Sequence, residues 1–120
     1  MRPDVRTYLI EVARKGQMCT YSDVNDACQL GLLWEGDADS GEIGRILGEI
    51  SVYEFEHNRP LLSAVVVGKN NPEQGKGFYT LCEELGLGSV GKLKKNFFGI
   101  LEMKRCHDFW GEDANYLRYS

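Results

Sequence analysis

Polar side chains with complementary chemistry gather between residues 54 and 76 of this chain. Glu54 offers a carboxylate, His57 an imidazole and Ser63 a hydroxyl, which are the groups that serve as general bases and nucleophiles in enzymes. Arg59 and Lys76 complete this polar cluster. The cluster predicts, as one alternative, a small nuclease or hydrolase.

The same residues also have a structural interpretation. Ser63 lies within an apolar run, and the Gly-x-Ser-x-Gly elbow that presents the nucleophile in many hydrolases is missing around it. Glu54, His57 and Arg59 stand just before Pro60, where they can form the polar end of a helix, with Arg59 satisfying carboxylates or the last carbonyl groups. The sequence leaves both roles open and favours the non-catalytic one.

A glycine-rich loop with two lysines, Lys69 and Lys76, follows the apolar run. Six residues separate Gly68 from the Gly75-Lys76 pair, where a nucleotide-binding P-loop has four, and Gly77 replaces the serine or threonine that would hold magnesium. The spacing therefore excludes a P-loop. A glycine turn that carries two solvated lysines is the default interpretation.

The cysteines do not form a metal-binding pattern. Without a Cys-x-x-Cys pair, zinc-ribbon spacing is absent, and reduced, mostly buried thiols are expected. The adjacent Cys106 and His107 can be imagined with His57 as a metal site, but one packed thiol beside one surface imidazole is the simpler explanation. We expect neither a metal nor a cofactor. The four thiols are Cys19, Cys28, Cys82 and Cys106.

The formal net charge is −4, and it is unevenly distributed. Residues 1–60 contain 6 basic and 11 acidic side chains, whereas residues 61–120 contain 8 and 7. An acidic protein lacks the general counterion-release affinity of basic DNA-binding proteins, so nucleic acid would need a local patch. The acidity favours a protein partner. The candidate residues for binding nucleic acid or a partner are Arg45, Arg59, Lys69, Lys76, Lys92, Lys94 and Lys95.

Helices dominate the elements expected in the first half. Apolar residues from Asp4 onward follow helical spacing until Gly16, and residues 18–21 are short and β-prone. Ser22 can cap a second helix that ends near Gly31. Residues 34–40 form a polar loop ending in a cap for a third helix, whose core face is Ile43, Ile46, Leu47, Ile50 and Tyr53.

The second half is expected to contain the sheet. Residues 61–67 are continuously apolar and β-branched, which is typical of a central strand covered on both faces. Residues 70–77 have strong turn chemistry, after which Phe78 and Tyr79 either begin a return strand or lead into a short helix that stops at Gly86. A last helix is predicted over residues 93–109, with Trp110 and the aromatic tail packing back over it. Its apolar stripe comprises Leu93, Phe97, Ile100, Leu101 and Met103.

Several segments, in their order, resemble the winged-helix domain of O6-alkylguanine-DNA alkyltransferases and alkyltransferase-like proteins. The segments are Thr20-Tyr21-Ser22-Asp23-Val24, Gly44-Arg45-Ile46-Leu47-Gly48, residues 60–67 and Gly75-Lys76-Gly77-Phe78-Tyr79. The resemblance covers about residues 17–80 and implies a recognition helix and a glycine-rich wing. Leu61-Leu62-Ser63 stands where that family has Cys-His-Arg, so the alkyl-accepting thiol is absent and alkyl transfer is not implied. The chain is also similar to small bacterial and phage proteins.

These observations predict one α+β domain over residues 1–120, with a winged-helix-like core, a small antiparallel sheet and an additional C-terminal helix. The predicted function is a non-catalytic binding module, of bacterial or phage origin, for a protein partner or nucleic acid. No stretch is apolar enough to span a membrane, and the expected compartment is the cytoplasm. Phe97 and Phe98 point about 100 degrees apart on a helix, so one of them needs a second partner. The tail of a monomer or the second subunit of a homodimer can provide it.

Overall fold

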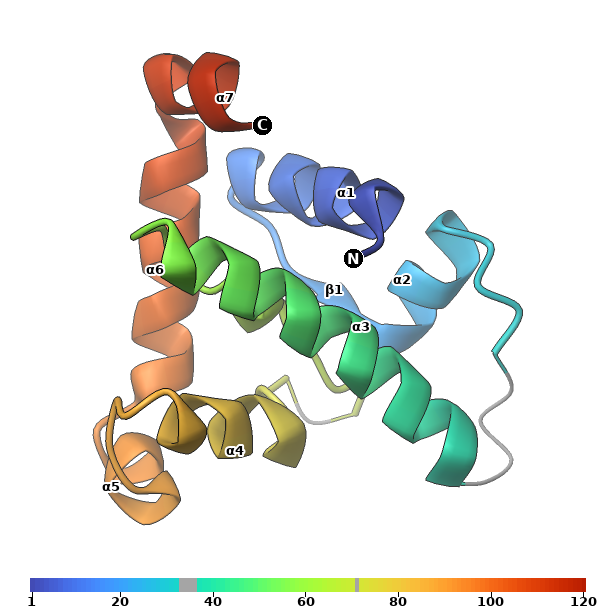
Figure 1. Ribbon diagram of the computed structural model, residues 1–120, viewed down its shortest axis with the longest axis vertical. Helices are drawn as coiled ribbons and strands as arrows, with labels where there is room; N and C mark the ends of the chain where they lie inside the picture. Colours follow the sequence, from blue (N-terminus) through green and yellow to red (C-terminus); the bar gives the residue numbers. More distant parts are fainter. Residues whose placement is uncertain (33–36, 71) are drawn as a thin grey trace.

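The computed structural model describes residues 1–32, 37–70 and 72–120, and describes residues 37–40 by their backbone alone. Helices account for most of the described chain (Figure 1). In chain order the elements are α1 (Pro3–Arg14), β1 (Cys19–Thr20), α2 (Tyr21–Ala27), α3 (Asp37–Glu56), the 3-10 helix η1 (Leu62–Val65), β2 (Val66–Val67), α4 (Lys76–Glu84), α5 (Val90–Lys95), α6 (Phe98–Gly111) and α7 (Asp113–Tyr119).

The predicted α+β winged-helix fold is wrong. The strands found among the described residues are β1 and β2, which are two residues long and pair in parallel, with Cys19 opposite Val66 and Thr20 opposite Val67. The structure is a helical protein, and the expected antiparallel sheet is replaced by this single short pairing. A wing built on such a sheet is therefore also ruled out.

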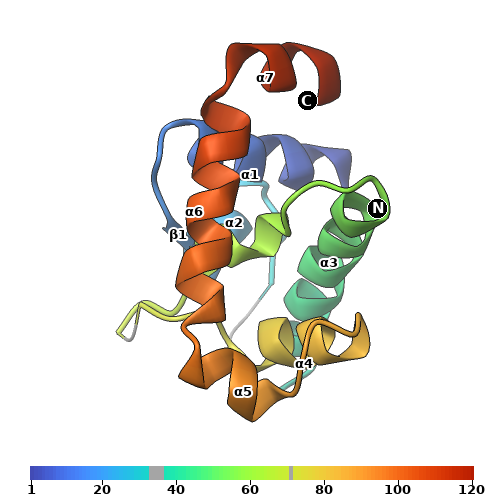
Figure 2. The same cartoon turned by 90° about the vertical axis from the view of Figure 1, so that its left-hand side faces the viewer.

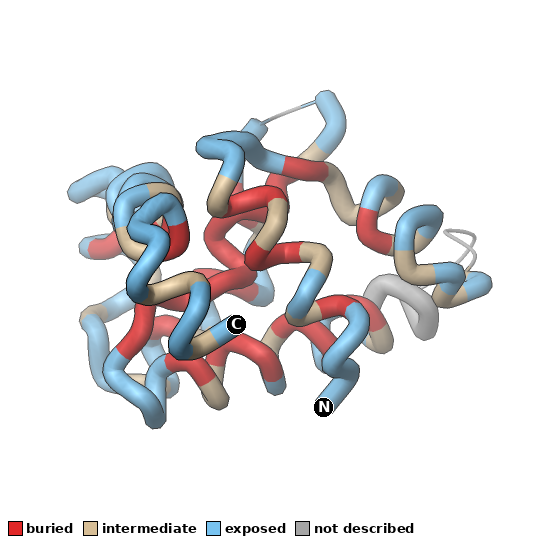
Figure 3. The backbone as a smooth tube through the Cα atoms, turned by 90° about the horizontal axis from the view of Figure 1, so that it is seen from above, coloured by how far each residue is buried: buried red, intermediate tan, exposed pale blue. Residues whose placement is uncertain are grey.

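The apolar run at residues 61–67 explains the error. Leu62–Val65 forms η1 and only Val66–Val67 is extended, although the whole run is buried. The burial comes from helices, because α1, α3 and α6 all pack against η1. Figure 3 shows the buried positions gathered on the inner sides of the helices. A continuous apolar run indicates that the segment is buried on all sides, but it does not distinguish a central strand from another kind of buried segment.

The predicted wing is instead the approach to a helix. Gly68 donates its backbone N–H to the Glu73 carbonyl at 3.1 Å, which closes the turn, and α4 begins at Lys76. The helical alternative for Phe78 and Tyr79 is thus confirmed. α4 ends before Gly86, whose φ of 81° lies in the left-handed region that glycine adopts without strain.

The helices of the first half agree with their periodicity. α1 ends before Gly16, which has a φ of 67°, and Ile43, Ile46, Leu47 and Ile50 of α3 are buried as predicted, while Tyr53 is half-buried. Two predicted caps are wrong. Thr20, not Ser22, caps α2, because its hydroxyl accepts from the Asp23 N–H and the Asp23 carboxylate accepts from the Thr20 N–H.

The third helix begins at Asp37, before Ser40, so Ser40 does not precede it. The predicted loop at residues 34–40 lies partly outside the described residues.

The single helix predicted over residues 93–109 is broken in two. Phe97 has a φ of 58°, which separates α5 from α6 and restarts the helical phase. The buried face of α6 consists of Gly99, Glu102, Cys106 and Trp110. The predicted stripe is wrong for Phe97, Ile100 and Leu101, which are all exposed.

The tail packs back over the last helix, as predicted, through Tyr119, whereas Leu117 is 81% exposed. Tyr119 stacks on Phe109 with ring centroids 6.0 Å apart, and the Arg6 guanidinium donates to the Tyr119 carbonyl at 2.7 Å. An ion pair also joins Arg14 of α1 to Asp113 of α7 at 2.6 Å. α7 therefore lies beside α1 at one end of the molecule (Figure 1).

Candidate functional site

The predicted catalytic cluster is divided among separate environments. Glu54 is fully buried, and its two oxygens accept from Arg59 Nε at 2.8 Å and Arg6 Nε at 2.9 Å. The ring of Tyr53 lies beside both guanidinium groups, 5.2 Å from Arg6 and 5.4 Å from Arg59. This arrangement binds the end of α3 to α1 and to the segment before η1. The structural interpretation of Arg59 as the partner of a carboxylate is confirmed.

Ser63 and His57 are not paired with each other. The Ser63 hydroxyl lies 2.6 Å from the Ser51 hydroxyl, and the Ser63 N–H donates to Ser51 Oγ at 3.0 Å. His57 is exposed, and its Nδ1 lies 2.7 Å from the Tyr53 carbonyl oxygen. Within the described residues, no nucleophile and base come together from Glu54, His57 and Ser63.

The cysteines are free thiols, three of them buried. Burial raises the pKa of Cys19 and of Cys82 to about 12, and it raises that of Cys106 well above its ordinary value. Cys106 donates to the Leu61 carbonyl at 3.2 Å, while the neighbouring His107 contacts the Gln17 carbonyl. The parts of the chain that the structure describes hold no cluster of three potential metal ligands.

Two of the seven predicted binding cations are already engaged. Arg45 forms ion pairs with Glu42 and Glu49 on its own helix, and its hydrogen bond with Glu42 raises the pKa of Arg45. Arg59 is buried against Glu54. Neither guanidinium is therefore available to phosphate groups or to a partner.

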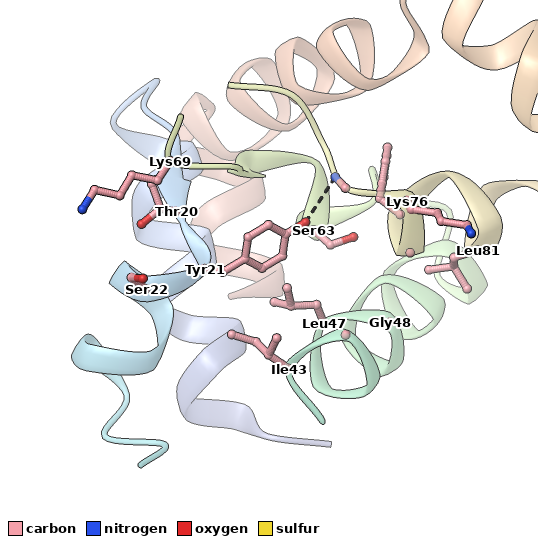
Figure 4. Close-up of a pocket in the computed structure, with 14 residues that line it drawn as sticks. Thr20, Tyr21, Ser22, Ile43, Leu47, Gly48, Ser63, Lys69, Lys76 and Leu81 are labelled. Carbon is pink, nitrogen blue, oxygen red and sulfur yellow. Dashed lines mark hydrogen bonds between the residues drawn. The ribbon is translucent and has the colours of Figure 1, made fainter. Parts of the chain in front are cut away.

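Lys69 and Lys76 line a cleft bordered by α2, α3 and α4 (Figure 4). Its volume is about 460 Å³, and Ser63 belongs to its lining. Ser63 is the predicted catalytic residue that lines this cleft together with predicted binding cations, and its hydroxyl is held there by Ser51.

The other three lysines belong to one short helix. Lys92, Lys94 and Lys95 lie on α5, and α6 continues from it with exposed apolar side chains along its outer side. Figure 2 shows α6 on the face toward the viewer with α5 at its lower end. We call this region the basic apolar surface and define it as Lys92, Lys94, Lys95, Phe97, Ile100, Leu101, Lys104 and Arg105.

Three apolar side chains give this surface its character. Phe97 is 69% exposed, Ile100 57% and Leu101 54%. Leu101 donates its N–H to the Phe97 carbonyl at 3.1 Å, so the two residues lie one helical turn apart at the start of α6. These residues were assigned to the core by periodicity. The adjacent positions of Phe97 and Phe98 indicate that the two rings cannot both face the core. Phe98 stacks on Phe78, and Phe97 is the exposed one.

Comparisons with protein-family models, with curated proteins and with solved structures found no match to this chain. The helices of the described residues include none with the length and apolar character needed to cross a membrane.

Proposed function

We propose that this protein is a non-catalytic binding module that recognises a protein partner through the basic apolar surface. The observation that carries the proposal is a concentration of positive charge around exposed apolar side chains. Residues 90–105 contain five basic side chains and one acidic one, so the remaining residues contain nine basic and seventeen acidic side chains. An acidic protein thus presents one locally cationic face.

The surface has the composition of a protein interface. Aromatic and arginine side chains are enriched at interfaces, and a few well-placed anchors contribute most of the binding free energy. Phe97 and Leu101 provide a central apolar ridge, and the lysines of α5 stand beside it. Such flanking charges increase the rate of encounter with an acidic partner more than they increase the final affinity.

The charges around the ridge limit the choice of partner. Glu102 is buried, and its two oxygens accept from the Leu61 N–H and from Arg105. Asp108 is the partner of Lys104. A symmetric homodimer through this face would bring the same cations of two copies together, which disfavours that homodimer. An acidic segment with spaced apolar side chains complements the surface best.

Nucleic acid is the weaker candidate. Arg45 and Arg59 are occupied by carboxylates, and the chain outside residues 90–105 is strongly acidic. Phosphate contacts would then rest on the α5 lysines with few others to extend them. Ile100 and Leu101 contribute no hydrogen bonds to bases or phosphates.

A peptide-display selection against the immobilised protein tests the proposal. We expect enrichment of acidic sequences with apolar residues at helical spacing. The double variant Phe97→Asn, Leu101→Gln should bind the selected peptides with an affinity lower by about tenfold or more, because interface anchors typically contribute over 1 kcal/mol. Leu117→Gln is the matched control, since Leu117 is 81% exposed on α7.

Two results would overturn the proposal. The first is selection of peptides whose affinity is the same for the double variant and for Leu117→Gln. The second comes from an electrophoretic shift assay at low and moderate salt, in which duplex or single-stranded oligonucleotides would bind and lose affinity when Lys92, Lys94 and Lys95 are changed to glutamine. Failure of both kinds of strand to bind at low salt removes the nucleic-acid alternative.

A further inference from the structure

The cleft beside Tyr21 is separate from the basic apolar surface and has different chemistry (Figure 4). Ile43 and Leu47 of α3 and Phe78 and Leu81 of α4 line it with apolar side chains. The volume of about 460 Å³ falls in the range of roughly 300–1,000 Å³ that is usual for small-molecule sites.

Glycines keep the cleft open. A Cβ atom added to Gly44 or Gly48 on α3, or to Gly77 on α4, would meet no atom within 4 Å. All three glycines line the cleft. Gly44 and Gly48 lie in the interior of α3, where glycine costs about 1 kcal/mol relative to alanine, so packing within the chain gives no reason for this choice. The missing side chains leave space that a ligand can occupy.

Tyr21 connects the α2 side of the cleft to the start of α4. Its hydroxyl accepts a hydrogen bond from the Gly75 N–H at 3.2 Å, drawn as the dashed line in Figure 4. A Cβ at residue 75 would lie only 2.5 Å from that hydroxyl, so glycine is required for this approach. The Thr20–Asp23 capping box fixes the start of α2 and with it the position of Tyr21. The cleft is therefore a defined feature of the fold.

The charges on the rim have one sign. Lys69 and Lys76 are the charged residues among those described that line the cleft, and both are exposed. Figure 4 shows them on opposite sides of Tyr21, with their ammonium groups directed outward at the rim. Among the described side chains, no carboxylate lies in ion-pair distance of either lysine. An apolar interior with a cationic rim is complementary to an amphipathic anion.

We infer that this cleft binds a small amphipathic carboxylate, with its apolar body between α3 and α4 and its carboxylate at the lysine rim. The aliphatic and aromatic walls exclude water around the body, and burial of that body supplies most of the affinity. The lysines act as exposed point charges, which adds a smaller preference for the anion. This inference does not depend on the partner proposed for the basic apolar surface.

Octanoate is the probe, and methyl-detected NMR is the measurement. We expect saturable shifts of the Ile43, Leu47 and Leu81 methyl groups, with little change at Ile100 and Leu101. Octanol, which has the same chain without the charge, should bind about two- to fivefold more weakly, which is the range of an exposed ion pair. Added salt should reduce octanoate binding and leave octanol binding unchanged.

Variants separate the cleft from the rest of the molecule. Gly48→Leu fills the space and should abolish the shifts, whereas Gly41→Leu is the matched control, on the same helix but outside the cleft lining. Lys76→Gln and Lys69→Gln together should remove the preference for octanoate over octanol, with Lys104→Gln as control. These lysines are exposed, so their variants test the inference even if Gly48→Leu fails to fold.

Three outcomes would overturn the inference. They are shifts that do not saturate, octanoate binding that persists in Gly48→Leu, and octanol binding as tightly as octanoate in the wild-type protein. A cleft that takes only a selected peptide segment and not octanoate would also reject a small-molecule site. The three results with octanoate and octanol do not bear on peptide binding by Phe97 and Leu101, which has its own test.

Discussion

The fully buried carboxylate of Glu54 stabilises two arginines, and we expect Glu54→Gln to be strongly destabilising. Oε1 accepts from Arg59 Nε at 2.8 Å, while Oε2 accepts from Arg6 Nε at 2.9 Å and from Arg59 Nη2 at 3.3 Å. Glutamine keeps the shape of the side chain but replaces one acceptor oxygen by an NH₂ group. That NH₂ group would face an arginine N–H, so one donor is left unsatisfied and the negative charge is lost.

The burial of the two arginines determines how much stability Glu54→Gln should lose. The side chain of Arg59 is 7% exposed and that of Arg6 is 12% exposed, so water cannot replace the lost carboxylate at either site. Removing one partner of a buried ion pair costs about 3–5 kcal/mol, because it leaves an uncompensated buried charge. A domain with a free energy of unfolding of about 5–15 kcal/mol would lose a large fraction of its stability.

Urea unfolding followed by far-ultraviolet circular dichroism measures this loss. Glu42→Gln is the matched control, because Glu42 lies on the same helix and pairs with Arg45 at the surface, and its midpoint should stay close to that of the wild type. Replacing Glu54 and Arg59 together by leucine and methionine should recover part of the stability, since the Arg59 charge is removed as well. A loss below about 1 kcal/mol for Glu54→Gln would mean that the arginines are solvated, and the reasoning would fail.

Three further predictions concern glycines, thiols and Phe97. Gly99→Ala should lower the free energy of unfolding by about 1–3 kcal/mol, because its Cβ would lie 2.1 Å from Gln74 Oε1. Gly48→Ala should raise it by up to about 1 kcal/mol, and changes of the same sign for the two variants in urea unfolding would contradict one of these predictions. The pKa of Cys19 and of Cys82 is raised from 9.0 to about 12 in the folded protein. The unfolded chain therefore loses these protons first as the pH rises, so the contribution of the two thiols to stability is complete below pH 9 and falls between pH 9 and 12. Each thiol should lower the free energy of unfolding by about 1.4 kcal/mol at pH 10 relative to pH 7. A Cys19→Ala, Cys82→Ala variant whose free energy of unfolding changes with pH as steeply as that of the wild type would refute this. Phe97→Asn should keep or raise the melting temperature, because asparagine tolerates the φ of 58° better than phenylalanine does, and a clear fall would show that the exposed ring is required for folding.

Periodicity located the helices that have one buried face. α1 and α3 follow the 3.6-residue repeat, and Ile43, Ile46, Leu47 and Ile50 are buried as their spacing predicts. Glycine chemistry likewise marked the ends of α1 and α4 at Gly16 and Gly86. These features depend on contacts within a few residues, which is why the sequence alone reveals them.

The conformation of the apolar run at residues 61–67 depends on contacts with distant parts of the chain. η1 is covered by three helices, and the backbone N–H of Leu61 that precedes it is satisfied by Glu102, 41 residues away. A buried carboxylate on a distant helix removes the need for a neighbouring strand at that position. No local pattern at residues 61–67 reveals such a partner, so the expected sheet was a reasonable but wrong inference from burial.

The candidate sites were only partly visible in the sequence. The lysines were identified correctly as surface groups, but their division between a cleft and the α5–α6 face follows from tertiary packing. The cleft depends on Gly44 and Gly48, which line it. Glycines inside a helix have no side chain, so the hydrophobic pattern of the sequence does not reveal that they border a cleft. Arg59 was recognised as a possible partner of carboxylates, and its burial with Glu54 removes it from the binding surface.

The rotation of α6 about its axis connects the core to the basic apolar surface. Glu102 must face inward to accept the Leu61 N–H at 2.9 Å, and the Gly99 carbonyl must accept from the buried Gln74 at 3.1 Å. Successive residues of a helix are separated by about 100 degrees, so a helix with positions 99 and 102 inside turns position 101 outward.

Nothing in this arrangement requires apolar side chains at the outward positions. Glu102 and Gly99 would fix the same rotation with polar residues at 97, 100 and 101, and polar residues there would cost the fold little. Single exposed apolar residues are common, but three within five residues, in a segment that holds five basic side chains, form a cluster of the kind associated with binding. If Phe97→Asn preserves stability while weakening the selected peptides, the ring at position 97 serves a contact outside the chain, and folding does not account for it.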